Sequence, residues 1–146
     1  MTIFIYAREE IEQLIEKEFP TKTAVISFYD PPVGSHEAPP VDFCGKAGRL
    51  FQAAVWDIHY DELEDYGLRY EDYFPEAEKL ASFIADAEKD GWDIICQCEY
   101  GQSRSAGCAA AIREFYEESG ISIFADYRYC PNQMIYHKVY DALVRL

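Results

Sequence analysis

An apolar run leads into a polar turn and then into small residues at Asp93-Ile-Ile-Cys-Gln-Cys98-Glu-Tyr-Gly-Gln-Ser-Arg104-Ser105. The first five residues are mostly apolar, and a run this short between turn signals predicts a buried strand. Residues 105–119 begin with small residues and stop before a glycine, which is typical of a helix. A strand joined to a helix by a tight loop is the repeating unit of α/β folds.

The same alternation extends through the rest of the chain. Apolar patterning predicts strands at residues 3–6, 23–28, 50–56 and 93–97, and helices at residues 8–18, 73–90, 105–119 and 132–146. We expect loops at residues 30–48, which are rich in proline and glycine, and at the acidic residues 57–72, and an extended segment at residues 121–124. This order predicts an α/β fold with a central, mostly parallel sheet of four to five strands and helices on both faces. The length predicts a single domain, residues 1–146.

The charge of the chain limits its partners. It carries 27 acidic and 13 basic residues, a formal net charge of −14, which repels nucleic acid and anionic membranes. No stretch approaches the roughly 20 apolar residues of a membrane span. We therefore expect neither a nucleic acid nor a membrane partner. An anionic substrate would need a strong local source of positive charge.

The cysteines and histidines favour a reduced protein without a metal. Five cysteines form an odd set with no CxxC pair, so their spacing indicates neither a disulfide framework nor a zinc site. Reduced thiols fit a cytoplasmic location. His36, His59 and His137 are too far apart to show ligand spacing. We expect no metal and no organic cofactor.

The loop between the predicted strand and helix has the residues needed for thiol chemistry on an anion. A free thiol has a pKa of about 8.5, but a helix N-terminus and the amides of a tight loop stabilise both a thiolate and a phosphate. Gly101 permits the backbone angles of a wrapped loop, and the planar fork of Arg104 can bind two phosphate oxygens. Ser105 at the helix entrance can donate a hydrogen bond to Cys98. The alternative is a structural turn in which Cys98 is a packing thiol and Arg104 a surface cation.

At these residues the sequence resembles the cysteine-based protein tyrosine phosphatase superfamily. In its length and in the order of its parts along the chain, it resembles the compact dual-specificity branch of that superfamily. The signature His-Cys-x2-Gly-x2-Arg-Ser/Thr stands here as Gln97-Cys98-Glu-Tyr-Gly-Gln-Ser-Arg104-Ser105. Residues 50–146, with Pro131-Asn132 before the last helix, look like small bacterial or phage members. The loop of this family is a phosphate-binding loop, or P-loop.

The resemblance implies a role for each loop residue. Cys98 would be the nucleophile, Arg104 would hold the phosphate, and Ser105 would stabilise the leaving thiolate. The residues that would bind the substrate phosphate are Glu99, Tyr100, Gly101, Gln102, Ser103 and Arg104.

Two further positions follow from the same resemblance. Gln97 stands where the family has a histidine that orients the loop and tunes the thiol. We expect the activation of Cys98 to be reduced but not lost, because glutamine can still hydrogen-bond to the loop backbone and the helix dipole, the loop amides and Arg104 remain. The family also uses an aspartate before the signature as general acid, and Asp57 after the predicted strand is our first choice, with Asp61 second. Each of these acids could instead be a solvated charge. Cys96 and Cys108 could capture an oxidised Cys98, although small buried packing residues are the better interpretation.

The sequence thus predicts a cysteine-dependent phosphomonoester hydrolase that acts through a phosphocysteine intermediate. Its substrate would be a phosphorylated protein or a small phosphomonoester. The alternatives are a catalytically weak phosphate-binding module, or a rhodanese-like sulfur carrier. The oligomeric state is left open.

Overall fold

Four parallel strands form a single sheet in the computed structural model, which describes residues 1–33 and 38–146. The strands are β1 (Ile3–Tyr6), β2 (Thr23–Tyr29), β3 (Arg49–Ala54) and β4 (Asp93–Gln97), in the spatial order β1-β4-β2-β3. β4 and β2 lie at the centre and pair in parallel with each other and with the two edge strands. This confirms the predicted α/β sheet, at the lower end of the expected strand number.

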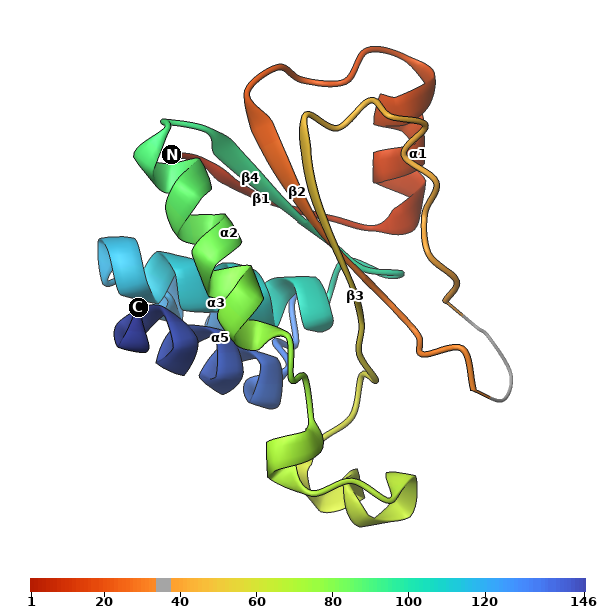
Figure 1. The fold of residues 1–146 in the computed structure, drawn as a ribbon, viewed down its shortest axis with the longest axis vertical. Helices are drawn as coiled ribbons and strands as arrows, with labels where there is room; N and C mark the ends of the chain where they lie inside the picture. Colours follow the sequence, from red (N-terminus) through yellow and green to blue (C-terminus); the bar gives the residue numbers. More distant parts are fainter. Residues whose placement is uncertain (34–37) are drawn as a thin grey trace.

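Helices cover both faces of the sheet (Figure 1). α1 (Arg8–Glu16) lies on one face, while α2 (Ala77–Lys89), α3 (Arg104–Glu117) and α5 (Gln133–Arg145) lie on the other.

The central strands are mostly apolar because successive side chains point to opposite faces and helices cover both faces. Val25 and Ile95 pack with Ile11 of α1, whereas Ile26 and Ile94 belong to the larger core under the other helices.

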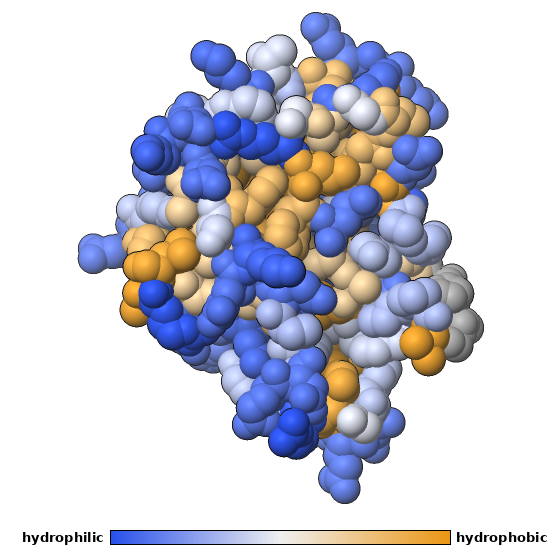
Figure 2. Space-filling model, viewed as in Figure 1, coloured by the Kyte–Doolittle hydropathy of each residue, from blue (hydrophilic) through white to orange (hydrophobic). Residues whose placement is uncertain are grey.

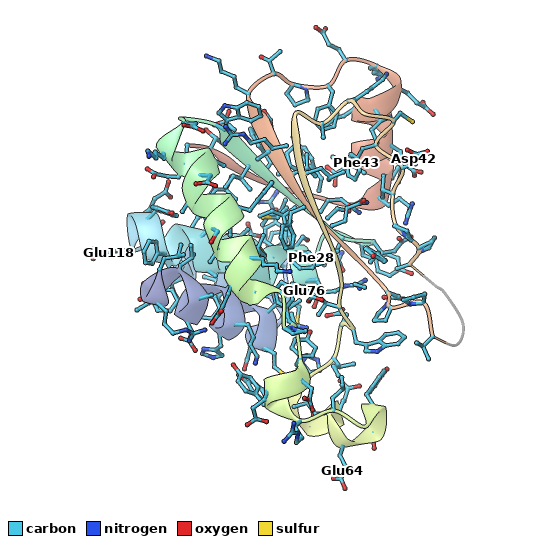
Figure 3. All side chains as sticks on the ribbon, in the orientation of Figure 1. Phe28, Asp42, Phe43, Glu64, Glu76 and Glu118 are labelled. Atoms are coloured by element: carbon cyan, nitrogen blue, oxygen red, sulfur yellow. The ribbon has the colours of Figure 1, made fainter. Side chains whose placement is uncertain are left out.

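The larger core positions the start of α3. Phe28 lies in the layer between the sheet and the helices and packs edge-on against Phe74, with ring centroids 5.9 Å apart (Figure 3). The first nine residues of α3, Arg104 to Ile112, are all buried. A helix with small residues on several sides can approach both the sheet and α5 closely, which explains the small-residue run seen in the sequence.

Most predicted elements agree with the structure to within two residues at each end, and two segments differ more. Residues 121–124 are not extended but form a short helix, α4 (Ile121–Phe124), because Ile123 N–H bonds to the Gly120 carbonyl. Of these four residues only Ile123 is buried, so the alternating burial of a strand is absent. α2 begins at Ala77 rather than at residue 73, because Phe74 has a left-handed φ of 52° and Pro75 follows it.

The acidic segment 57–72 is a loop that contains three 3-10 turns, η1 (Tyr60–Glu62), η2 (Glu64–Tyr66) and η3 (Tyr70–Asp72). It projects from the body of the molecule, with Glu64 at its far end (Figures 1 and 3). Hydrophilic side chains cover much of the face in Figure 2, in keeping with the net charge. Within residues 1–33 and 38–146, no helix combines the length and apolar character needed to cross a bilayer.

Candidate active site

Cys98 follows directly on β4, and the loop that it begins ends at the first residue of α3. Its side chain is buried, with 3% of the residue exposed. The Cys98 Sγ lies 3.1 Å from the Ser105 Oγ, so the two groups share a hydrogen bond. The predicted pairing of these two residues is therefore present in the geometry.

The carbonyl groups of the loop are held by the elements around it. The Glu99 carbonyl accepts from Arg8 N–H at 3.1 Å, and the Gln102 carbonyl accepts from Cys130 N–H at 2.9 Å. The Ser103 carbonyl accepts from Asn132 N–H at 3.0 Å. In the described part of the chain, the amides of residues 99–103 donate to no other residue, which leaves a run of N–H groups able to bind an anion.

Gly101 is required by the way that this loop packs. Its φ is +66°, and a Cβ on it would stand 2.7 Å from the Ala7 nitrogen and 2.9 Å from the Tyr6 carbonyl carbon. Both contacts are to backbone, which has no flexible end to move aside. Only glycine fits both the conformation and the space.

Gln97 hydrogen-bonds to the loop backbone, as expected, and also to a side chain of β2. Its Nε2 donates to the Cys98 carbonyl at 2.9 Å, and its Oε1 accepts from the Ser27 hydroxyl. Ser27 is opposite Gln97 because β2 is the neighbour of β4. The buried glutamine therefore fixes the first peptide of the loop without carrying a charge.

Arg104 is buried and held from two sides. Its Nη1 donates to the Asp30 Oδ1 and to the Val55 carbonyl, both at 2.8 Å, and its side chain is 6% exposed. The alternative of a surface cation is therefore wrong. Asp30 was not singled out in the sequence, although it comes directly after β2.

Asp57 lies at the same cavity as Arg104. This cavity has a volume of about 410 Å³, and its lining includes Asp30, Trp56, Asp57, Tyr66, Tyr100 and Arg104. Asp57 Oδ1 accepts hydrogen bonds from the Ser103 hydroxyl at 2.6 Å and from Asn132 Nδ2 at 3.0 Å. Asp61, the second choice, is exposed and is not among the lining residues.

Glu99 also lines this cavity, but its carboxylate is paired with Arg8, whose Nε lies 2.7 Å from Glu99 Oε2. Arg8 in turn donates to the Pro39 carbonyl. The pair ties the loop that begins at Cys98 to the start of α1. It also neutralises one negative charge at this cavity.

The other buried thiols form a pair of their own. Cys96 and Cys108 are fully buried, and the hydrogen bond between them, together with burial, raises the pKa of Cys96. This agrees with their interpretation as small packing residues. Among the residues that the structure describes, no three His, Cys, Asp or Glu side chains gather to hold a metal ion, and His36 lies outside those residues.

Comparison with known proteins gives a consistent structural result. No family model and no curated protein matches the sequence. Human DUSP28 is similar in structure, with a TM-score of 0.53 and 14% identity over 98% of this chain and 92% of that chain. PTPMT1 in complex with PI(5)P has a TM-score of 0.53 and 11% identity, with 99% and 91% of the two chains covered. Tk-PTP in its active form has a TM-score of 0.55 and 9% identity, with 100% and 94% covered.

The chain therefore has the fold of the cysteine-based protein tyrosine phosphatases, in the small form of the dual-specificity group. This confirms the fold that the resemblance at Cys98 implies. The likeness to bacterial or phage members stays a prediction.

Proposed function

We propose that the protein is a cysteine-dependent phosphomonoester hydrolase. The observation that carries the proposal is the convergence of Arg104 and Asp57 on one cavity at the loop that begins with Cys98. The loop amides and the Arg104 guanidinium supply the local positive potential that an anionic substrate needs in a chain of net charge −14.

In the first step the Cys98 thiolate attacks the phosphorus atom. The new S–P bond forms as the bond from phosphorus to the leaving oxygen breaks, and Asp57 gives that oxygen its proton. The amides of residues 99–103 and Arg104 bind the equatorial oxygens, where negative charge is concentrated in the transition state. The product alcohol departs, and the phosphoryl group stays on Cys98.

In the second step water attacks the phosphocysteine. Asp57, now a carboxylate, takes a proton from the water while the water oxygen forms its bond to phosphorus. The S–P bond breaks and returns the electron pair to Cys98, where the Ser105 hydroxyl at 3.1 Å donates to the departing thiolate. Inorganic phosphate and the starting enzyme result, and the proposal uses neither a metal nor an organic cofactor.

The lining of the cavity is compatible with a phosphorylated protein or a small aryl phosphate. Trp56, Tyr66 and Tyr100 line it, and aromatic side chains can pack against an aryl ring. Neither a nucleic acid nor a membrane is part of the proposal, and a single domain in the cytoplasm stays a prediction.

Phosphate release from an aryl phosphate tests the proposal. We expect turnover that is abolished in Cys98→Ser, reduced by about 100-fold or more in Asp57→Asn, and inhibited by vanadate. The exposed Cys44 supplies a matched control, since Cys44→Ser should keep full activity. Equal turnover by native protein and Cys98→Ser would refute the role of the thiol.

A second candidate is a phosphate-binding module with little turnover. The hydrogen bonds of Arg104 to Asp30 and Val55 favour it, because a guanidinium held by a carboxylate offers a phosphate less attraction. Binding of phosphate without release from any aryl ester would select this function. Thiosulfate turnover without phosphatase activity would select the rhodanese-like alternative.

A further inference from the structure

Asn132 connects three parts of the candidate site. It is fully buried and lies between α3 and the start of α5. Its side-chain Nδ2 donates to Asp57 Oδ1 at 3.0 Å and to the Ile58 carbonyl at 3.1 Å, and its own amide donates to the Ser103 carbonyl. The side-chain Oδ1 accepts from Ile135 N–H at 2.9 Å and so caps α5. Every polar atom of this side chain is therefore used.

Ser103 provides the second contact to the same oxygen. It occupies the N-cap position of α3, where a serine hydroxyl commonly accepts from the first turn of the helix. Here the hydroxyl makes no cap hydrogen bond and instead donates to Asp57 Oδ1 at 2.6 Å. The first turn of α3 therefore has no hydrogen bond to a side-chain cap, and Asp57 Oδ1 accepts a hydrogen bond from a residue of the loop that begins at Cys98.

The two carboxylate oxygens of Asp57 are thus unequal. Oδ1 accepts from both Ser103 and Asn132, whereas no group in the described residues donates to Oδ2. An oxygen that already accepts two hydrogen bonds is the poorer site for a proton, because protonation would break one of them.

We propose that Ser103 and Asn132 are positioning residues that hold Asp57 by Oδ1, so that Oδ2 is the oxygen that gives and takes the proton. This inference rests on the proposed function of Asp57 as general acid. In the first step the proton leaves Oδ2 for the oxygen of the departing alcohol, and in the second it returns to Oδ2 from water. The acid is held against the catalytic loop before any substrate arrives, since both donors belong to the protein.

The test compares aryl phosphates whose leaving groups differ in basicity. A strongly basic leaving group, as in phenyl phosphate, needs a proton, whereas 2,4-dinitrophenolate departs without one. We expect Ser103→Ala and Asn132→Ser to lower kcat/KM on phenyl phosphate, which reports the first chemical step and not the hydrolysis of the phosphocysteine, by about 10- to 100-fold, the effect of losing one hydrogen bond to a charged group. On 2,4-dinitrophenyl phosphate the loss in kcat/KM should stay below about threefold, because Asp57 does not need to protonate that leaving group in the first step.

Two features of these variants separate positioning from folding. Serine at position 132 retains an N-cap side chain for α5 but is too short to keep the contact with Asp57. Ser103→Thr keeps the hydroxyl and should recover most of the activity on phenyl phosphate that Ser103→Ala loses.

The outcomes are distinct. Equal losses in kcat/KM on both esters, or no loss on either, would overturn this inference while leaving the phosphatase proposal in place. Absence of Cys98-dependent release from both esters by the native protein would overturn the proposed function and this inference together.

Discussion

Gly107 offers a direct test of the packing that supports the site. It lies in the first turn of α3, and a Cβ on it would stand 2.4 Å from the Asn132 carbonyl oxygen and 3.2 Å from the Asn132 nitrogen. Carbon and oxygen atoms do not approach closer than about 3.3 Å without repulsion, so the helix or the Asn132 backbone must shift by about 1 Å. We therefore expect Gly107→Ala to displace Asn132.

The size of the effect follows from two opposed contributions. Alanine is favoured over glycine inside a helix by about 1 kcal/mol. Overpacking in a close-packed interior costs about 1–3 kcal/mol, and two buried backbone segments put this case at the upper end. The free energy of unfolding should fall by about 2 kcal/mol, which lowers the Tm of a chain of this size by about 4–8 °C.

Thermal unfolding and kinetics on phenyl phosphate measure both consequences of Gly107→Ala. Activity should fall because the contact of Asn132 with Asp57 is displaced along with the backbone. Gly91→Ala is the matched control: Gly91 has a φ of +73° with open space around its Cβ position, so alanine there costs about 1 kcal/mol of stability and leaves activity unchanged. A Gly107→Ala variant as stable as the native protein would refute the reasoning.

Three further predictions concern the loop and its supports. Gln97→His should raise the rate of Cys98 alkylation at neutral pH, because an imidazolium would stabilise the thiolate; an unchanged or slower rate would contradict this. Asp30→Asn should lower the free energy of unfolding by about 3 kcal/mol, because the buried Arg104 loses its counter-charge, and inorganic phosphate should raise the Tm of this variant more than that of the native protein. Equal phosphate effects would show that the anion does not reach Arg104. The raised pKa of Cys96 adds stability that is complete below the pKa of the unfolded thiol, about 8.5, and is lost as pH rises through the folded-state value. The free energy of unfolding measured with urea should therefore fall above about pH 8.5, and it should fall less steeply in Cys96→Ala. The same dependence on pH in both proteins would contradict this prediction.

The sequence carried enough information for the α/β layers and for the catalytic loop. The strand before Cys98 and the helix after Arg104 are read from local patterns, and loop chemistry depends on residues close together in the chain. Asp57 could be chosen because it follows a strand, and parallel strands bring their carboxyl ends to one edge of the sheet. Its place at the cavity with Arg104 agrees with that choice.

The supporting residues could not be read from the sequence because they depend on the order of strands. Ser27 reaches Gln97 only because β2 lies beside β4, and Asp30 reaches Arg104 for the same reason. Asn132 could be recognised as a residue before a helix, but its contact with Asp57 spans 75 positions and needs the folded arrangement. Local patterns identify such residues as caps or loop acids and do not reveal their partners.

The most direct measurement of the central claim is the chemical state of Cys98 during turnover. The protein is mixed with an aryl phosphate, quenched in denaturant within the first turnover, digested and analysed by mass spectrometry. We expect one phosphoryl group on the peptide that contains Cys98, increased in Asp57→Asn with a good leaving group and absent in Cys98→Ser. Phosphate release with no phosphoryl group ever found on Cys98 would contradict the mechanism.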